Sequence, residues 1–330
     1  MWPPSFFTGP KPNPAKFSPR RNETLHRHVI MMKKLLKLAL PVFLVAGALA
    51  LVFLLRRPEP IAESHFVEPD KLFQTLQANV RDRAEFEMIV DIDHARLEAK
   101  AGSPMPPSHV LIWSVPALDA AVLKHNPVAA VDLPLRILAY ENQETGKAAV
   151  IYNSYEFVTR RHSLPEDAPL RDGYGPAVAK AVKGIPEDAI SKFPSDAMPD
   201  AGLVTLTSPY SFESTEKRVR DAIAANPDTV FLGEVDFAAR SKTRGVELRP
   251  LKLILFGGPG PGGSAMASTP TLGLDAFCQK LLIWQDERGK VHVTFNDLLA
   301  LAERQGISGG LPLWVINGRM RETFSAALAQ

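Results

Sequence analysis

The sequence predicts an α+β protein with two tandem copies of a small domain, each an antiparallel sheet backed by helices, preceded by one transmembrane helix. Three observations carry this prediction: an internal repeat, short apolar segments joined by hairpin-type turns, and an uncharged apolar run near the N-terminus. We expect each copy to follow the order β-α-β-β-α-β-β-α. The hairpins and the lack of regular βαβ alternation argue against a doubly wound parallel sheet.

Composition and charge limit the classes of protein that this chain can belong to. With 45% hydrophobic and 22% charged residues over 330 positions, the chain is globular in composition and long enough for about two domains. Residues 1–57 hold ten Lys or Arg and one Glu, a charge of +9, so the other residues carry 2 − 9 = −7. An acidic body argues against a nucleic-acid-binding surface. The single cysteine, Cys278, excludes an internal disulfide and a multi-cysteine zinc site.

The N-terminal region predicts attachment to a membrane. We expect a disordered basic tail over residues 1–34 and a membrane anchor over residues 35–57. The run from 38 to 55 has 18 uncharged residues, just enough to cross an apolar bilayer core of about 30 Å. Because basic residues precede this run, the positive-inside rule puts the N-terminus in the cytoplasm and the body in the periplasm or outside the cell. Cleavage of the run as a signal peptide, and a start at Met31 or Met32, stay open as alternatives.

The internal repeat defines the domain organisation. Adding 143 to a position in the first copy gives its counterpart in the second, and a dozen pairs are identical where roughly four would match by chance. The identical pairs are Asp93/Asp236, Ala95/Ala238, Gly102/Gly245, Pro107/Pro250, Pro116/Pro259, Pro127/Pro270, Asp132/Asp275, Gly146/Gly289, Lys147/Lys290, Val150/Val293, Asn153/Asn296 and Arg161/Arg304. One extra residue after Asp275, compensated before Gly289, predicts a bulge or a shifted turn.

Hydrophobic periodicity and turn residues assign the elements of each copy. The first copy, residues 58–163, is expected to hold a strand at 64–67, a helix at 70–80, strands at 86–93 and 109–114, a helix at 117–125, a hairpin of 135–141 with 147–153, and a helix at 155–161. The second copy, residues 204–308, is expected to repeat this order with a helix at 211–225, strands at 229–236 and 251–256, a Gly- and Pro-rich connection, a hairpin of 278–284 with 290–295, and a helix at 298–305.

Two further segments complete the chain. The Pro-rich connector at 164–203 is expected to contain one short helix, at 177–182. The C-terminal extension at 309–330 begins with an apolar segment, 311–316, that we expect to add a strand or to pack on the second domain.

The residues around the first hairpin resemble a known family. The run D-L-P-L-R-I-L-A-Y from Asp132 to Tyr140, with Pro116, Asn126-Pro127, Gly146-Lys147 and Tyr152-Asn153, is similar to the bacterial and archaeal family called domain of unknown function 302 (DUF302). The resemblance covers residues 64–162 and 207–305, and it is looser where Asp275 to Lys280 replaces the D-L-P-L-R run. It implies compact domains with a curved antiparallel sheet backed by helices, and it implies no catalytic residue and no cofactor.

Six residues form the candidate ligand-binding set, because they are charged or titratable and stand at the ends of predicted strands. They are Asp93, His109, Asp132, Arg136, Asp236 and Asp275. The aspartates also fit a purely structural role, since a carboxylate at a strand end accepts backbone N–H bonds in turns and caps. Arg136 has the geometry to bind an anion through two parallel bonds, but it also fits an exposed strand position. Its counterpart is Gln279 or Lys280, depending on the local gap.

Three other features carry weaker functional signals. The histidines His94, His109, His125 and His162 all fall in the first copy without metal-ligand spacing, so we expect solvated or capping side chains. The run Gly257 to Gly263 lacks the Lys-Ser/Thr of a phosphate loop, and its two prolines remove N–H donors, so a surface loop is expected. Cys278 is expected to be a buried, inert thiol.

These observations favour a non-catalytic module on the extracytoplasmic side, held to the membrane by residues 38–55, that binds a small ligand or an envelope protein and whose two repeats pair with each other. The alternative is a hydrolase that uses Asp132, His109 and Arg136 in the first copy. The residues that the copies share are mostly typical of a fold signature. Function is therefore expected at the unshared positions, notably the histidines and Arg136, or on the surface that the copies make together.

Overall fold

The computed structural model describes residues 59–165, 168–193, 202–308 and 310–329. They belong to one compact unit, Pro58–Gln330. The expected tail at 1–34 and the expected anchor at 35–57 lie outside the described residues. Within these described ranges, no helix is both long enough and apolar enough to cross a membrane.

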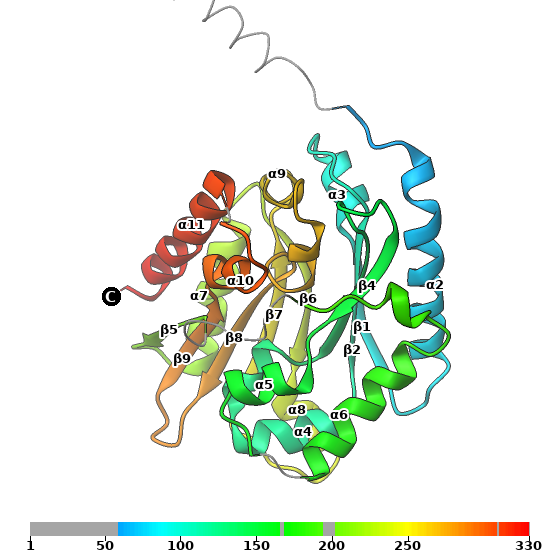
Figure 1. Cartoon of the computed structure of the whole chain (residues 1–330). Coiled ribbons are helices and arrows are strands. Elements are labelled where there is room, and N and C mark those ends of the chain that lie inside the picture. Colours follow the sequence, from blue (N-terminus) through cyan, green and yellow to red (C-terminus); the bar gives the residue numbers. More distant parts are fainter. Residues whose placement is uncertain (1–58, 166–167, 194–201, 309, 330) are drawn as a thin grey trace, which may run out of the picture. The chain divides into compact units, whose positions relative to one another are not determined.

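Two antiparallel sheets with helices confirm the α+β class (Figure 1). The first sheet has the order β1-β2-β3-β4, with β1 (Glu87–Asp93), β2 (Ser108–Ser114), β3 (Leu135–Glu141) and β4 (Ala148–Tyr152). The second has the order β5-β9-β8-β7-β6, with β5 (Leu203–Ser208), β6 (Val230–Asp236), β7 (Leu251–Gly257), β8 (Gln279–Gln285) and β9 (Val291–Asn296). Each copy of the repeat therefore forms its own sheet.

The strand register locates the extra residue of the second copy. In the first sheet Ile112 pairs with Arg136, and in the second the counterpart of Ile112, Leu255, pairs with Lys280. Lys280 is therefore the structural counterpart of Arg136, one residue later than the shift of 143. The hairpin turn that follows spans 286–290 against 142–147 in the first copy, one residue fewer, which restores the register as expected.

The helices also recur in both copies. The first copy contributes α2 (Val67–Arg81), α3 (His94–Lys100), α4 (Pro116–His125), α5 (Tyr155–Arg161) and α6 (Ala168–Ala181), with the short 3-10 helices η1 (Glu63–His65), η2 (Pro127–Val131) and η3 (Glu187–Ala189). The second contributes α7 (Phe212–Ala224), α8 (Phe237–Lys242), α9 (Pro261–Met266), α10 (Leu298–Arg304) and α11 (Gly310–Leu328), with the 3-10 helix η4 (Pro270–Leu274).

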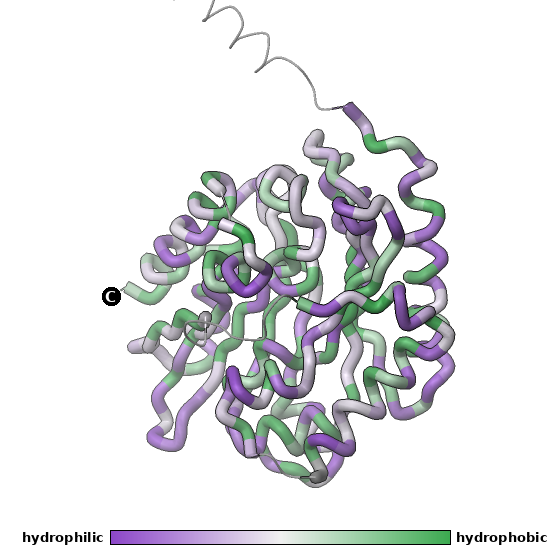
Figure 2. The backbone as a smooth tube through the Cα atoms, viewed as in Figure 1, coloured by the Kyte–Doolittle hydropathy of each residue, from purple (hydrophilic) through white to green (hydrophobic). Residues whose placement is uncertain are grey.

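Local sequence explains how these helices begin and which face they bury. In α2 the buried residues Phe73, Leu76 and Val80 follow helical spacing and pack on the first sheet, and hydrophilic residues alternate with them along the helix (Figure 2). Ser154 and Asp297 occupy equivalent positions before α5 and α10, and each side chain accepts a backbone N–H of the first turn. The same capping signal therefore starts the closing helix of both copies.

Several elements differ from the sequence-based expectation. Residues 64–67 form the end of η1 and the start of α2 instead of a strand, because residues 62–65 are exposed and present no apolar face to a sheet. Strand β5 has no counterpart in the first sheet; in the second copy it supplies the first strand of the expected order, although its residues were not assigned from the sequence. The short helices α3 and α8 were also not expected; each begins at a capping aspartate, Asp93 or Asp236.

The connector and the C-terminal extension each form a long helix. The connector contains α6, which is longer than the expected 177–182 and includes Pro176. Residues 311–316 belong to α11 and are not a strand, because the buried positions Leu313, Met320 and Phe324 recur at helical spacing on one face. In both copies the additional helix packs against the long helix that precedes the four strands common to both sheets, α6 on α2 and α11 on α7.

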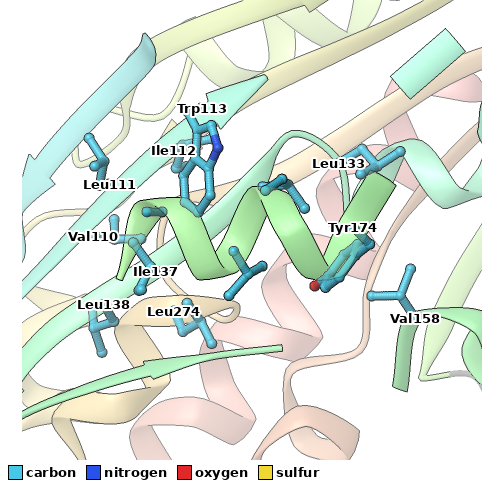
Figure 3. Close-up of a cluster of buried hydrophobic side chains, with 14 of the residues drawn as sticks. Val110, Leu111, Ile112, Trp113, Leu133, Ile137, Leu138, Val158, Tyr174 and Leu274 are labelled. Atoms are coloured by element: carbon cyan, nitrogen blue, oxygen red, sulfur yellow. The ribbon is translucent and has the colours of Figure 1, made fainter. Parts of the chain in front are cut away.

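The two copies pack into each other reciprocally. Helix η4 of the second copy lies on β2, β3 and β4 of the first sheet, and η2 of the first copy lies on β7, β8 and β9 of the second. In the same way α3 contacts α9, and α8 contacts α4. The apolar core is continuous across this boundary, and Figure 3 shows Leu274 of η4 beside Ile137 and Leu138 of β3. Each copy thus completes the core of the other.

Candidate functional site

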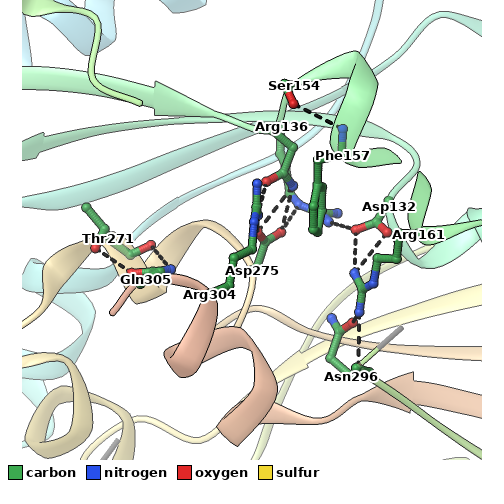
Figure 4. A network of polar contacts seen from close by, with 12 residues as sticks. Asp132, Arg136, Ser154, Phe157, Arg161, Thr271, Asp275, Asn296, Arg304 and Gln305 are labelled. Carbon is green, nitrogen blue, oxygen red and sulfur yellow. Dashed lines mark hydrogen bonds and ion pairs between the residues drawn. The ribbon is translucent and has the colours of Figure 1, made fainter. Parts of the chain in front are cut away.

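Three of the identical pairs in the repeat meet in one buried polar cluster between the copies (Figure 4). We call this set of side chains the central cluster. It contains Asp132, Asn153 and Arg161 of the first copy, their counterparts Asp275, Asn296 and Arg304, and also Arg136, His162 and Lys280. All nine side chains are buried. The aspartates follow η2 and η4, the 3-10 helices that carry each copy onto the sheet of the other.

Asp132 is surrounded by nitrogen atoms of two arginines and one histidine. Arg161 donates from Nη1 to both carboxylate oxygens at 3.0 and 2.9 Å, and Arg136 Nη2 donates to Oδ1 at 2.5 Å. Nε2 of His162 lies 2.5 Å from Oδ2. Burial by itself would raise the pKa of Asp132, but Arg161, His162 and Arg136 hold this pKa well below its usual range. Asp132 therefore stays ionised, with both oxygens already engaged.

Asp275 repeats this arrangement with fewer donors. Arg136 Nε donates to its Oδ1 at 2.5 Å, and Asn153 Nδ2 lies 3.2 Å from each oxygen. Arg304 Nη1 lies 3.5 Å from Oδ2 and donates to Asn153 Oδ1 at 2.6 Å. Burial opposes ionisation here as well, yet Arg136, Lys280 and Arg304 lower the pKa of Asp275 below its ordinary value.

Arg136 connects the two halves, because its single guanidinium contacts both aspartates. It also donates from Nη1 to the Val131 carbonyl at 3.1 Å and is only 4% exposed. Burial would lower the pKa of Arg136, but Asp275 and Asp132 outweigh it and raise this pKa, so the group is charged. The interpretation of Arg136 as an exposed strand residue is wrong, since η4 of the other copy covers its strand.

Lys280 and Asn296 break the similarity between the halves. Lys280 and Asn296 lie opposite each other at the ends of β8 and β9, next to the paired residues Leu281 and Phe295. Arg136 and Asn153 hold the same places in the first sheet, next to the paired residues Ile137 and Tyr152. Lys280 is shorter than arginine and makes one hydrogen bond, from Nζ to the Asp275 carbonyl at 3.0 Å. Asn296 accepts from Arg161 at 2.7 Å, but its buried Nδ2 has no partner among the described residues.

Charge in the central cluster is unequal. Among its described side chains, the four cationic groups Arg136, Arg161, Lys280 and Arg304 face the two carboxylates Asp132 and Asp275. A buried charge is costly unless it is paired. Burial, followed by repulsion from Arg136, lowers the pKa of Lys280 to about 8. A small anion beside Lys280 and Asn296 would reduce both the charge excess and the number of unused donors.

The other predicted site residues lie elsewhere. Asp93 and Asp236 cap α3 and α8, where they accept the backbone N–H of Arg96 and Ala239. His109 pairs with Ala139, three positions from Arg136, so its side chain points to the opposite face of the first sheet, where it stacks on Phe73 with ring centroids 3.3 Å apart. Of the proposed hydrolase residues, Asp132 and Arg136 meet, whereas His109 is separated from both by the sheet.

The histidines are more buried than expected. Only His125 of the four is exposed. Nε2 of His94 lies 3.0 Å from the Gly273 carbonyl, and burial lowers the pKa of His94 to about 4, so this ring is neutral. Groups of three or more ligand-type side chains that could hold a metal ion are absent from the described part of the chain. Cys278 is buried, which raises the pKa of its thiol to about 11 and makes it unreactive.

The glycine-rich run is not a surface loop. Its last residues begin α9, and Gly262 and Gly263 are buried against Glu98 of α3. A Cβ on Gly263 would lie 2.5 Å from the Ser103 carbonyl oxygen, so glycine is required for the close approach of α3. The Glu98 carboxylate accepts the backbone N–H of Gly260, and burial raises the pKa of Glu98. The run therefore serves packing between the copies.

Sequence reasoning missed six members of the central cluster as site residues: Asn153, Arg161, His162, Lys280, Asn296 and Arg304. The repeat itself held the signal. Asn153/Asn296 and Arg161/Arg304 are identical pairs of polar residues, which exposed surface positions have no reason to keep. Together with the pair Asp132/Asp275, they form a set of complementary charges and amides that a search for buried pairs would have selected.

Comparison with known proteins gives one family and several relatives. Residues 62–180 and 204–327 match the family described as DUF302, domain of unknown function. A protein named fluoride-specific ion channel FluC 1 from Brucella suis biovar 1 (strain 1330) is 37% identical over 121 residues, 36% of this chain and 47% of the relative. The channel of the same name from Brucella abortus biovar 1 (strain 9-941) is also 37% identical over 121 residues, 44% of its length. This chain thus spans less than half the length of these relatives.

A solved structure also matches. The crystal structure of an uncharacterized conserved DUF302 protein from Bacillus stearothermophilus aligns with a TM-score of 0.33 and 13% identity, over 38% of this chain and 95% of that one.

Proposed function

The chain belongs to the DUF302 family and carries two copies of its domain, and we propose that the two copies together form a binding unit for a small inorganic anion. The observation that carries this proposal is the charge excess of the central cluster, where four buried cationic groups face two carboxylates among the described residues. An anion beside Lys280 would accept a charge-assisted hydrogen bond from the ammonium and a second bond from the Asn296 amide.

The size of the site favours a small anion. Every side chain of the central cluster is buried, so a ligand with several heavy atoms would have to displace packed residues. The name of the Brucella relatives supports fluoride as the first anion to test. Their aligned length of 121 residues is close to that of one DUF302 copy, which is 119 residues for 62–180 and 124 for 204–327. The shared part is therefore comparable in length to one half of the proposed binding unit.

The geometry favours binding over catalysis. Both oxygens of Asp132 are engaged by Arg161, Arg136 and His162, so this carboxylate has no free position for a substrate proton or a water. His109 lies on the opposite face of the first sheet and does not reach it. We therefore propose a non-catalytic unit in which the central cluster receives the anion and the aspartates hold the cationic groups in place.

Anion binding is tested by thermal unfolding of the full chain in potassium fluoride, chloride or phosphate, each against potassium gluconate at equal ionic strength. A bound anion stabilises the folded state in proportion to the logarithm of its concentration. We expect one small anion to raise the Tm and Lys280→Met to abolish this response. Lys217→Gln, which removes a cation from the exposed face of α7, is the matched control and should respond like the wild type.

The pH dependence provides a second readout. Because the pKa of Lys280 is lowered to about 8, the ammonium loses its proton as the pH rises through 8, and anion affinity should fall over the same range. Absence of any anion-specific change in Tm, or an equal change in Lys280→Met, would exclude the central cluster as the anion site.

We also propose that residues 38–55 anchor this unit to a membrane, with the folded body on the extracytoplasmic side. The uncharged run of 18 residues and its basic flanks support this arrangement. An alkaline phosphatase fusion placed after Arg57 should be active in cells. An inactive but stably expressed fusion would reverse the orientation.

A further inference from the structure

A second candidate site lies outside the central cluster, in a pocket of the second copy between α7, α11, the C-terminal end of β7 and the N-terminal end of β8. The pocket holds about 530 Å³ of empty space, including its open mouth. Apolar side chains form most of its wall, among them Ile223, Phe256, Phe277 and Phe324. The pair Asp228 and Arg319, joined by bonds of 2.6 and 2.8 Å, stands among its lining residues.

The pocket exists because the second copy lacks two aromatic rings that fill the same place in the first. Phe86 and Trp113 are buried in the first copy with ring centroids 6.3 Å apart. Their counterparts in the shift of 143 are Thr229 and Phe256, both of which line the pocket. Met320 and Phe324 of α11, which replace Ala177 and Ala181 of α6, refill part of the space.

Of the polar residues that line the pocket, Gln279 is the most buried. Gln279 lines the pocket and is only 6% exposed, yet its amide makes no hydrogen bond to any described residue. Its counterpart is Leu135, since Trp113 pairs with Leu135 in the first sheet and Phe256 pairs with Gln279 in the second. A ligand in the pocket that forms a hydrogen bond with this amide gains affinity from that contact.

We propose that this pocket binds a small aromatic molecule that carries one hydrogen-bonding group, of the size and chemistry of indole. The second copy lacks the phenyl of Phe86 and the five-membered part of the Trp113 indole, and together they define the size and aromatic character of the occupant. The Gln279 amide defines its polarity, because the amide oxygen accepts an N–H or O–H and the amide nitrogen donates to an oxygen. Pockets that bind small molecules are commonly apolar with a few such polar groups.

The test compares indole with indene, which has the same two fused rings but no N–H. Binding to the full chain is measured by ligand-observed NMR titration, with displacement to establish a single site. Wild-type protein should bind indole about tenfold more tightly than indene, because a single hydrogen bond has about that effect. The double variant Thr229→Phe with Phe256→Trp, which restores the rings of the first copy, should lose binding of both compounds.

Gln279→Leu is the second variant and keeps the test decisive if the double variant fails to fold. It copies the first-copy residue, so it should bind indole and indene equally, through loss of the preference for indole. Saturable binding that the double variant abolishes, or a preference for indole that Gln279→Leu removes, supports the proposal. No saturable binding at millimolar indole, equal binding by a folded double variant, or an unchanged preference in Gln279→Leu overturns it.

Discussion

The two copies keep the same strands and the same central residues but differ in how the cluster is completed. In the first copy Arg136 reaches both aspartates and Asn153 is fully bonded, whereas in the second Lys280 makes one bond and the Asn296 amide nitrogen has no described partner. The polar groups of the first half thus have their hydrogen-bond partners, whereas the second half has donors that are not used. The identical pairs of the repeat therefore form a common framework. The one position that differs, Arg136 in the first copy and Lys280 in the second, is where we propose that an anion binds.

The packing between the copies shows the same pattern of compensation. Helix α3 brings the large Glu98 against α9, where the second copy has Gly262 and Gly263. Helix α8 contacts α4 in return, and the equivalent of Glu98 is the small Ser241, while the equivalents of the two glycines are Asp119 and Ala120. At the α3–α9 contact the larger residue belongs to the first copy and the glycines to the second. At the α8–α4 contact the larger residue, Asp119, again belongs to the first copy, but it lies on the other helix of the pair and faces the small Ser241.

The largest expected effect tests whether Arg136 is the framework residue. Arg136→Met leaves Asp132 and Asp275 with fewer partners in a buried site, and we expect a loss of about 3–5 kcal/mol of unfolding free energy. Lys280→Met removes a cation from a cluster that has an excess of them, so its effect should be within about 1 kcal/mol of zero. Urea unfolding measures both. Equal losses of unfolding free energy would mean that Arg136 and Lys280 contribute equally to stability, contrary to this expectation.

A pH-dependent effect of similar size should come from the α4–α8 contact. Asp119 is buried beside Ser114, and burial raises its pKa from 3.8 to about 7. A carboxyl group with a raised pKa gives its full stabilisation below pH 4, and this is lost as the pH rises to 7. Asp119→Asn should therefore be more stable than wild type at pH 8, by up to about 4 kcal/mol, and show little difference at pH 4.

The control for this prediction is the difference between variant and wild type at each pH, which cancels the titration of other groups. The second copy has Gly262 at the position equivalent to Asp119, so Asp119 itself has no titrating counterpart there; the α3–α9 contact instead holds Glu98, whose pKa is also raised by burial. A constant difference between pH 4 and pH 8 would show that Asp119 is not held neutral by burial.

A smaller effect is expected at the α3–α9 contact. Gly263→Ala places a Cβ 2.5 Å from the Ser103 carbonyl oxygen and 2.9 Å from Glu98 Cβ, so the backbone must move. We expect a loss of about 1–3 kcal/mol, the usual cost of overpacking. Chemical unfolding measures this loss. Helix α4 has Ala120 at the equivalent position, where the facing residue is the small Ser241 and not Glu98. An unchanged stability of Gly263→Ala would therefore contradict the closer packing of α3 on α9.

The smallest effect compares two equivalent helical glycines, Gly175 in α6 and Gly318 in α11, where an added Cβ would have open space within 4 Å. Gly318→Ala should stabilise the protein by about 0.5–1 kcal/mol through helix propensity. Gly175→Ala should gain less, because Pro176 disfavours helical geometry in an alanine before it. Thermal unfolding of both variants decides the order, and a larger gain at Gly175 would reverse it.

Most of the fold could be predicted because its signals are local. Turn residues and alternating apolar positions define the hairpins of β3 with β4 and of β8 with β9, and the repeat confirms each assignment. The full length of α6 and α11 was not predicted: the prolines of the connector suggested loops around a short helix at 177–182, and the apolar segment 311–316 was expected to add a strand or to pack on the second domain. Their role becomes visible only when each is placed against α2 or α7.

The candidate site could be predicted only in part. Asp132, Arg136 and Asp275 were selected because they are charged and end or begin strands, but Arg136 was expected to be exposed. Its burial depends on η4, which lies more than a hundred residues away in the sequence. Local patterns do not contain such long-range coverage, and a charged residue is exposed by default. The identical polar pairs of the repeat were the available sign that these residues are buried together.

The reciprocal packing of the two copies has an evolutionary consequence. The same arrangement built by two identical chains would be a twofold dimer, in which every substitution appears twice. Arg136 and Lys280 could not then differ, and the cluster would hold two arginines or two lysines. Joining both copies in one chain removes that constraint, so each half can mutate alone. A gene duplication followed by fusion is therefore what permits one centre to combine a saturated half with a half that has spare donors.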